Sequence, residues 1–266
     1  MASSDFLLTV LGTRGSTVAS GPAYTEFGGN TSCYLIQAGK NVIYLDAGSG
    51  LISSPETLCK TPVILLSHLH LDHLLGLGMS PLFAQRDTQL SLYVPFCGDK
   101  ETARDLIARL YSPPFWPLCL DELGSHVRFC SLSDSFNIGE VRIETMQGSH
   151  PGGCIVYKLQ YAGKAVIYAT DYEHSKESDV RLISFADGAD LMLYDAQYDS
   201  GEYEEKKGFG HSTAEKGIEI MECAHVKRLL LIHHGVTSTD FVLREREENL
   251  NSKRVSYARE GQTIIL

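Results

Sequence analysis

The chain has 266 residues, of which 43% are hydrophobic and 21% charged, so it is long enough to bury a large core. Its formal net charge of −10 and its pI near 5.4 exclude a generally basic surface and argue against a protein that grips long nucleic acid through phosphate contacts. Seven scattered cysteines without a CxxC pair indicate neither a disulfide framework nor a thiolate zinc site, and they predict small buried side chains in a reducing compartment. No basic segment precedes Phe6–Val10, and no apolar run approaches the roughly 20 residues of a membrane helix, so a cytoplasmic protein is expected.

Short runs rich in β-branched and aliphatic residues predict strands, because each is bounded by Gly, Asp, Asn or Ser. These runs are Phe6–Leu11, Asn41–Leu45, Pro62–Leu66, Leu90–Val94, Val127–Cys130, Val141–Thr145, Ile155–Tyr161, Ala165–Ala169, Leu191–Tyr194, Arg228–Ile232 and Gln262–Leu266. Helical periodicity predicts helices at Lys100–Tyr111, Ser178–Phe185, Ser212–Ala224 and Asp240–Leu250. No linker or low-complexity tract divides the chain, and we expect one domain over residues 1–266.

Two segments, Ala38–Asp46 and Ala162–Asp171, are similar to each other. Each has an Ala-Gly-Lys turn followed by a buried strand that ends in aspartate. This similarity suggests two related halves and predicts an α+β fold, a four-layer αββα sandwich of two mostly antiparallel sheets with outer helices. It also puts both aspartates at strand ends, where functional sites collect.

The segment Ser67–His73, Ser-His-Leu-His-Leu-Asp-His, follows directly on the predicted strand Pro62–Leu66. Histidines at positions i and i+2 cannot share a helix face, but both can point inward from a tight loop. Asp72 and His73 then face another side as a helix begins. One loop therefore can offer two ligands to each of two adjacent metal ions, and imidazole with carboxylate suits Zn²⁺, Mn²⁺ or Fe²⁺.

A two-metal site needs more ligands than one loop supplies. His150, Asp171 and His233 each follow a predicted strand directly, so each can reach the same edge of the sandwich. His174 lies three residues after Asp171, and whether it touches substrate or a ligand stays open. The other histidines are less well placed for this edge and are interpreted as surface or satisfied core groups: His126, His225 and His234.

With these motifs the chain resembles the metallo-β-lactamase superfamily, whose signature His-x-His-x-Asp-His corresponds to His68–His73. The resemblance covers nearly the whole chain. It is closest to the phosphodiesterase branch, which includes ribonuclease Z and the cyclic phosphodiesterase of the carbon–phosphorus lyase pathway. The supporting segments follow the order of that branch: Leu11–Ser16, Gly28–Cys33, Leu45–Gly48, His150–Gly153, Thr170–Asp171, Tyr194–Tyr198, Gly210–Ala214 and Leu231–His234.

The resemblance implies two divalent metal ions, with Zn²⁺ expected first and Mn²⁺ or Fe²⁺ also accepted. It implies these ligands: His68, His70 and His150 for one ion, Asp72, His73 and His233 for the other, and Asp171 as the bridge. His211 would face the scissile phosphate as a catalytic group rather than a ligand. Asp195 would orient His211, at a position where ribonuclease Z carries a glutamate.

The expected reaction is cleavage of a small or cyclic phosphodiester by a hydroxide that bridges the metals, which Asp72 would hold in line with phosphorus. No inserted basic, glycine-rich arm of the kind that grips tRNA is found, so long nucleic acid is not the expected partner. The alternative is hydrolysis of a carboxyl ester, lactone or thioester by the same metals. A third reading is a non-catalytic protein that binds a nucleotide or a partner on this scaffold.

Two further features have more than one interpretation. The aromatic and proline-rich segment Tyr111–Leu118 can be a flap over the site, a packed surface loop or a dimer contact, and a homodimer stays open. Arg14 and the pair Lys206–Lys207 are candidate phosphate partners, although solvated surface charge is the simpler interpretation of the lysines.

Overall fold

A computed structural model describes residues 5–55, 59–85, 87–96, 99–122, 126–250 and 252–266. Its strands form two seven-stranded sheets. The first sheet has, in spatial order, β14 (Thr263–Ile265), β1 (Phe6–Gly12), β2 (Cys33–Ala38), β3 (Asn41–Leu45), β4 (Val63–Leu65), β5 (Gln89–Tyr93) and β6 (His126–Cys130). The second has β13 (Val255–Tyr257), β12 (Leu229–Ile232), β11 (Leu191–Asp195), β10 (Lys164–Ala169), β9 (Cys154–Tyr161), β8 (Val141–Gly148) and β7 (Ser135–Ile138).

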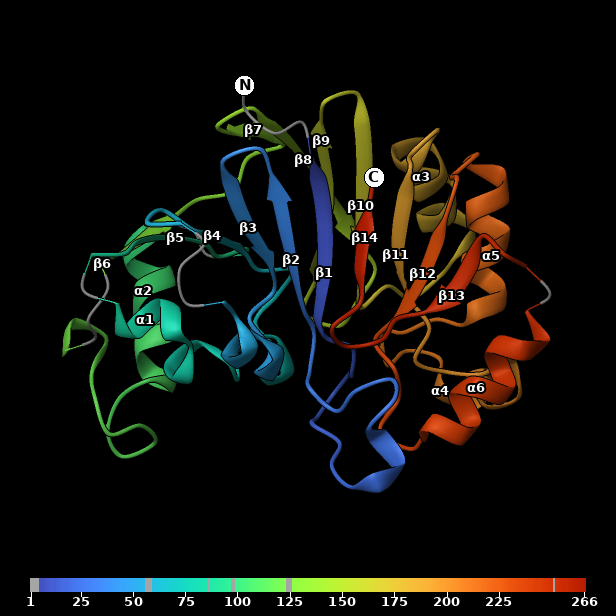
Figure 1. Ribbon diagram of the computed structural model, residues 1–266, viewed down its shortest axis with the longest axis horizontal. Coiled ribbons are helices and arrows are strands. Elements are labelled where there is room, and N and C mark those ends of the chain that lie inside the picture. Colours follow the sequence, from blue (N-terminus) through green and yellow to red (C-terminus); the bar gives the residue numbers. More distant parts are fainter. Residues whose placement is uncertain (1–4, 56–58, 86, 97–98, 123–125, 251) are drawn as a thin grey trace.

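The helices lie on the outer faces of the two sheets (Figure 1). They are α1 (Pro81–Ala84), α2 (Lys100–Leu110), α3 (Lys176–Ala186), α4 (Ser200–Lys206), α5 (Ala214–Cys223) and α6 (Asp240–Asn249). Short 3₁₀ turns complete the described elements: η1 (Pro22–Tyr24), η2 (Ser49–Ser53), η3 (Leu71–His73), η4 (Leu77–Met79) and η5 (Leu120–Glu122). The predicted four-layer αββα sandwich is confirmed. No helix in the described part of the chain is long and apolar enough to cross a membrane.

Three hydrophobic layers hold the sandwich together. The layer between the sheets contains Leu8, Tyr34, Ile43, Leu159 and Leu193. A second layer joins the first sheet to α1 and α2, and a third joins the second sheet to α3, α5 and α6. All three residues of β4 are buried because both faces of that strand are covered, which explains a continuous apolar run instead of alternation.

The two sheets have matching internal organisation, as the similarity of the two Ala-Gly-Lys segments suggested. The hairpins β2–β3 and β9–β10 are antiparallel, and each is continued by parallel strands. Pairings from β3 to β6 and from β10 to β13 are parallel, so the sheets are mixed where mostly antiparallel ones were expected. The sequence pattern missed these connections because the residues of a buried strand do not encode the direction of its neighbour.

The structure corrects other local expectations. Strands β2, β7 and β13 and helices α1 and α4 were not predicted; apart from β2 these elements are short, with three to seven residues each. The cysteines are not uniformly buried: Cys33 and Cys154 are buried, whereas Cys119 and Cys223 are exposed. Cys97 lies outside the described residues, as do Met1–Ser4.

Candidate metal centre

The predicted ligands lie at one edge of the sandwich, where strands of both sheets end (Figure 1). The loop after β4 carries His68 and His70, and His150 follows β8. Asp171 follows β10, and His233 follows β12. Strands β8, β10 and β12 run in the same direction within one sheet, so the residues that follow them lie at the same edge.

The local conformation after β4 explains why one short loop serves two groups of ligands. His70 is extended, with φ −67° and ψ 150°, so His68 and His70 lie on one side while Leu69 packs into the outer core. The 3₁₀ turn η3 then begins at Leu71 and rotates Asp72 and His73 inward, where both are buried.

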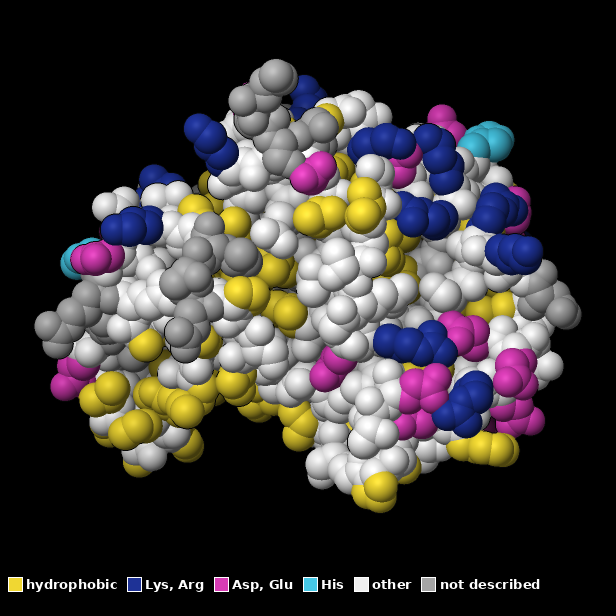
Figure 2. Space-filling model, in the orientation of Figure 1, with side chains coloured by type: hydrophobic (Ala, Val, Ile, Leu, Met, Phe, Trp, Pro, Cys, Tyr) yellow, Lys and Arg dark blue, Asp and Glu magenta, His cyan; other side chains and the backbone are white. Residues whose placement is uncertain are grey.

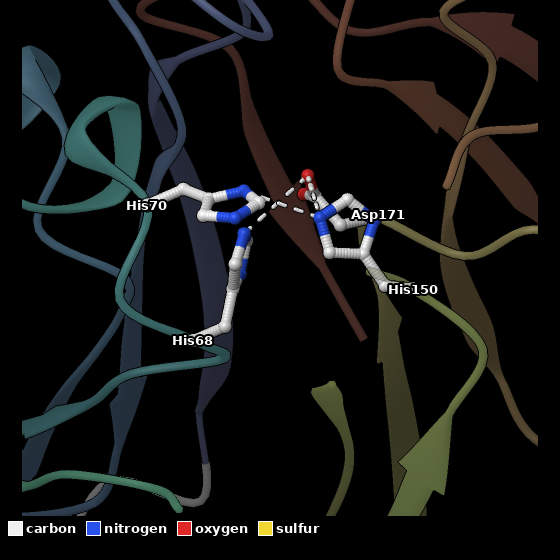
Figure 3. A group of neighbouring side chains, drawn as sticks. All are labelled: His68, His70, His150 and Asp171. Carbon is white, nitrogen blue, oxygen red and sulfur yellow. Dashed lines mark hydrogen bonds and ion pairs between the residues drawn. The ribbon is translucent and has the colours of Figure 1, made fainter. Parts of the chain in front are cut away.

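His68, His70 and His150 form a first group, named here the open cluster because His70 is exposed, although the side chains of His68 and His150 are only 3% and 2% exposed. Figure 3 shows their rings pointing toward one another and toward Asp171. One ligand atom from each of the four residues lies within 4.8 Å of all the others. Nε2 of His150 lies 3.2 Å from Nδ1 of His70, and Nε2 of His68 lies 3.7 Å from Oδ1 of Asp171.

Asp72, His73 and His233 form a second group, named here the buried cluster since all three are shielded from solvent. Nε2 of His73 lies 3.1 Å from Oδ2 of Asp171, and Nε2 of His233 lies 3.2 Å from the same oxygen. Asp171 therefore presents Oδ1 to the open cluster and Oδ2 to the buried cluster. This is the arrangement of a carboxylate that bridges two ions.

The Nδ1 nitrogens of His68, His73 and His150 face away from the clusters and have hydrogen-bond partners, whereas the buried Nδ1 of His233 has none. Nδ1 of His73 lies 2.7 Å from Oδ2 of Asp46, and Nδ1 of His68 lies 3.0 Å from Oγ of Ser67. Nδ1 of His150 lies 2.9 Å from the carbonyl oxygen of Gly210. Such partners fix the tautomer of a metal-binding histidine. Nε2 of His68 and Nε2 of His73 are buried, face the clusters and make no hydrogen bond, so the donor set fits two divalent ions.

Electrostatics differ between the clusters. Burial, with the nearby charge of His73, lowers the pKa of His68 to about 2, which keeps its imidazole neutral with a lone pair to donate. Burial disfavours a charged His73 as well, but the carboxylates of Asp171, Asp46 and Asp72 outweigh it and raise the pKa of His73 well above its usual value. The buried cluster thus concentrates negative charge that a cation would neutralise.

Several site residues have left-handed backbone conformations that are uncommon outside glycine. The φ angles are 60° at Asp46, 49° at Asp171, 60° at His233 and 64° at Ser16. Each costs on the order of 1–3 kcal/mol and persists only where surrounding contacts fix it. Asp46, Asp171 and His233 lie just after the ends of β3, β10 and β12, so strained backbone occurs where strands end at the clusters.

His211 and Asp195 lie beside the clusters. Nδ1 of His211 is 2.8 Å from Oδ2 of Asp195, which also accepts a hydrogen bond through Oδ1 from the backbone N–H of Gln197. The His211 ring stacks on His233 with centroids 4.9 Å apart, and its edge contacts Tyr198. The predicted pair is therefore adjacent to the ligands, and its catalytic role stays a prediction.

The histidines interpreted as non-ligands lie outside the clusters. His126 is exposed on β6, and His225 pairs with Asp187 at 3.0 Å. The buried His234 turns away, with Nε2 2.8 Å from the carbonyl oxygen of Ala258. His174 contacts Oγ of Ser212 at 2.8 Å, so it touches the residue next to His211 and not a ligand.

Arg14 is not placed to bind phosphate. Its side chain is fully buried and donates to the carbonyl oxygens of Gly28, at 2.7 Å, and Ser238, at 2.6 Å. Lys207 pairs with Glu204 on the surface, in agreement with the simpler interpretation of the lysines. In the segment 111–118, Tyr111 is buried and its hydroxyl donates to the carbonyl oxygen of Leu74, whereas Phe115 and Leu118 are 79% and 43% exposed.

Figure 2 shows a hollow at the lower edge of the molecule, below the strand ends that carry the clusters, with hydrophobic side chains gathered to its left. The large exposed hydrophobic residues of the described chain include Met79, Phe115 and Leu118. Phe96 is 51% exposed and has a φ of 58°, although it is not glycine. Its ring packs against Gly153, in the turn after His150: a Cβ built on Gly153 would lie 2.9 Å from the ring.

Sequence reasoning missed residues that hold the ligands in place. Asp46 was noted at a strand end, but its contact with His73 was not foreseen. The backbone N–H of Ser16 donates to Oδ2 of Asp72 at 2.8 Å, and Glu173 binds the loop before His211. The signal that could have found Asp46 is its place directly after a buried strand, matched by Asp171 in the similar segment, whereas the other two contacts leave no mark in local sequence.

The fold and the donor set define a metal-dependent hydrolase with a dinuclear divalent-metal site. The chain belongs to the beta-lactamase superfamily, since the model of the beta-lactamase superfamily domain matches residues 35–234. The ribonuclease Z relatives support the phosphodiesterase branch of the metallo-β-lactamase fold.

Two ribonucleases Z illustrate the sequence similarity. The chain is 25% identical to ribonuclease Z of Thermoplasma acidophilum, over 78% of this chain and 83% of that protein. It is also 25% identical to the mitochondrial ribonuclease Z 2 of Schizosaccharomyces pombe, over 88% of this chain. The match spans only 35% of the length of that yeast protein.

Solved structures share the fold. The metallo-β-lactamase fold protein YhfI from Bacillus subtilis superposes with a TM-score of 0.74 at 21% identity, covering 99% of this chain and 100% of that one. A diphosphatase from the PhnP family has a TM-score of 0.70 at 17% identity, covering 97% of both chains. These similarities establish the fold, and the chemistry is inferred from the residues of this chain.

Proposed function

We propose that the chain is a dinuclear-metal phosphodiesterase that cleaves a small or cyclic phosphodiester. The observation that carries this proposal is the His211–Asp195 pair beside two clusters joined by Asp171. Ester hydrolysis with a good leaving group needs only the metals. An alkoxide leaves a phosphodiester with difficulty, so an acid placed next to the metals favours phosphodiester chemistry.

In this proposal His68, His70 and His150 hold one ion, Asp72, His73 and His233 hold the other, and Asp171 contacts both. Two divalent ions supply positive charge for a phosphate group and make water nucleophilic at neutral pH. Zn²⁺ suits these imidazole and carboxylate ligands best, with Mn²⁺ and Fe²⁺ as alternatives that metal analysis decides.

The protein's own groups prepare the reaction. Asp195 accepts a hydrogen bond from Nδ1 of His211, which leaves Nε2 as the nitrogen that gives a proton to the departing oxygen. Asp72 is held by the backbone N–H of Ser16, so one of its oxygens keeps a fixed direction. It can then accept a hydrogen bond from the attacking water. The buried position of His211, 7% exposed, limits competing water.

RNA is the second candidate substrate, because the curated relatives are ribonucleases Z. That similarity stands in tension with the expectation that long nucleic acid is not a partner. The net charge of −10 favours the small substrate, since phosphate contacts along a long RNA require a basic surface. The homodimer, the single-domain organisation and the cytoplasmic location remain proposals of the same kind.

The test compares four substrates with one purified, metal-analysed protein: bis(p-nitrophenyl) phosphate, a set of cyclic nucleotides, a precursor tRNA and an aryl carboxyl ester. We expect turnover of the first two and none of the tRNA. Efficient tRNA cleavage would select the RNA candidate. Ester turnover without phosphodiester turnover would overturn the phosphodiesterase and select the ester, lactone or thioester hydrolase.

A companion experiment isolates His211. We expect His211→Ala to retain about two metals per chain while phosphodiester hydrolysis slows by roughly 10²–10⁴-fold. Loss of metal in this variant would show that His211 is a ligand, and the ligand assignment would then be wrong. Asp195→Asn should reproduce part of the same rate loss, again with the metals retained.

A further inference from the structure

The short segment after Asp171 holds the loop that leads to His211. The two carboxylate oxygens of Glu173 accept hydrogen bonds from the backbone: Oε1 from the N–H of Gly208 at 2.6 Å, and Oε2 from the N–H of Gly210 at 2.9 Å. The backbone N–H of Glu173 in turn donates to the carbonyl oxygen of Ser149 at 2.7 Å. Glu173 thus joins the segments that carry Asp171, His150 and His211.

The backbone of residues 208–210, which Glu173 binds, has an unusual conformation. Gly208 and Gly210 have φ angles of 89° and 92°, a region that residues with a side chain rarely adopt. A Cβ on Gly210 would lie 2.0 Å from Nδ1 of His150 and 2.5 Å from Cδ of Pro151. The loop therefore passes against His150 with no room for a side chain, and the carboxylate of Glu173 satisfies the two amides that point away.

The position of Gly210 affects two side chains of the site, the imidazoles of His150 and His211. The carbonyl oxygen of Gly210 lies 2.9 Å from Nδ1 of His150, so the position of Gly210 sets the orientation of that imidazole. The next residue is His211, whose ring lies between Asp195 and His233. A displaced Gly210 would move one nitrogen of the open cluster and the candidate proton donor together.

We propose that Glu173 is a positioning residue that aligns His150 and His211 through the backbone of residues 208–210. A carboxylate suits this role better than an amide, because both of its oxygens accept, whereas glutamine would present an N–H to one of the two backbone donors. The effect on His150 concerns metal binding alone. The effect on His211 rests on the proposed phosphodiesterase reaction.

The experiment uses Glu173→Gln and Glu173→Ala in the full chain, with Glu204→Gln as the matched control. Glu204 is an exposed glutamate two residues before Lys206, and it pairs only with Lys207 in the contacts described. The first readout is the amount of Zn²⁺ retained per chain at increasing concentrations of a chelator. We expect one of the two ions to leave the Glu173 variants at about a tenfold lower chelator concentration than in the wild type or the control.

The second readout separates positioning from general damage. Cleavage of bis(p-nitrophenyl) phosphate releases a stable phenolate that needs little protonation, whereas a cyclic nucleotide releases an alkoxide that does. Misplacement of His211 should therefore slow the cyclic nucleotide about tenfold more than the aryl substrate. A loop that is merely loosened would slow both substrates by one common factor.

Thermal unfolding of each variant establishes that the compared proteins are folded. If Glu173→Ala does not fold, the comparison uses Glu173→Gln alone. Wild-type chelator resistance in a folded Glu173 variant overturns the role toward His150. Equal rate losses on the two substrates overturn the role toward His211. If the wild-type protein cleaves no phosphodiester, the proposed function fails, and the chelator measurement still decides the part that concerns His150.

Discussion

The two halves of the metal centre differ in how they are held. The buried cluster has fully enclosed imidazoles at His73 and His233, and a carboxylate, Asp46, fixes His73. The open cluster has an exposed His70, and its other rings are fixed by a hydroxyl and a backbone carbonyl oxygen. A buried carboxylate holds a ring more firmly than an uncharged hydroxyl or carbonyl partner does.

This difference suits the two clusters to different roles. The buried cluster is suited to retain an ion permanently, because its ligands are shielded and its partner is a buried carboxylate. The open cluster is suited to meet substrate, since His70 and the turn after His150 border the solvent. Variants that act on one cluster and not on the other test this difference directly. A variant of the bridging Asp171 should affect both clusters at once.

The largest effect is expected from Asp171→Asn. The amide keeps one acceptor oxygen and puts an NH₂ group, which cannot bind a cation, toward the other cluster. We expect loss of at least one metal per chain and a fall in hydrolysis of at least about 10³-fold. Metal analysis and kinetics of the same preparation measure both. Asp190→Asn is the control, because Asp190 is buried but pairs with Lys164 and Lys227 away from the clusters.

Asp46→Asn should act on the buried cluster. Asp46 accepts hydrogen bonds from Ser67 through its backbone N–H and its hydroxyl, and also from the hydroxyl of Tyr168, besides its contact with His73. Replacing the carboxylate leaves the His73 ring poorly fixed, and we expect metal affinity to fall about 10–100-fold. A lower melting temperature should accompany it, since a buried network is broken. Unchanged zinc affinity by competition titration would contradict the proposed division of the centre.

Most ligands of both clusters could be predicted from the sequence. His68–His73 was interpretable because a strand, an extended dipeptide and a helical turn follow one another within a few residues. His150, Asp171 and His233 followed from a single rule, that ligands collect where strands end. Glu173 and Ser16 could not be found this way, because their partners lie 37 and 56 positions away and are reached through loop conformation.

The fold, too, could be predicted from the sequence only in part. The four layers followed from the internal repeat and the buried apolar runs. The parallel pairings from β10 to β13 did not, since direction is set by the helical connections α3, α5 and α6 and not by the strands themselves. Short edge strands such as β7 and β13 were missed because pairing with a neighbour, and not propensity, makes them strands.

A chelator should distinguish the clusters without any substitution. We expect one ion to leave the wild-type protein at roughly a tenfold lower chelator concentration than the other. The ion held by the open cluster should leave first, and histidine NMR signals of His70 and His150 should change before those of His73 and His233. Simultaneous release of both ions would mean that the bridge through Asp171 outweighs the difference in burial, and the comparison would then fail.

The smallest effect is expected at the rim of the open cluster. The ring of Phe96 lies against the turn after His150, half exposed, on a backbone with φ of 58° that an aromatic residue rarely adopts. If that ring contacts the flat group of a substrate, Phe96→Ala should raise KM for an aryl phosphodiester about tenfold, the value of one stacking contact. kcat and metal content should stay unchanged, because the substitution leaves every ligand in place. Phe115→Ala is the control: that ring is exposed on the segment 111–118, and its loss should leave KM unaltered. An equal KM in both variants would mean that the strained Phe96 serves only the packing of Gly153, and that substrate approaches the open cluster from another side.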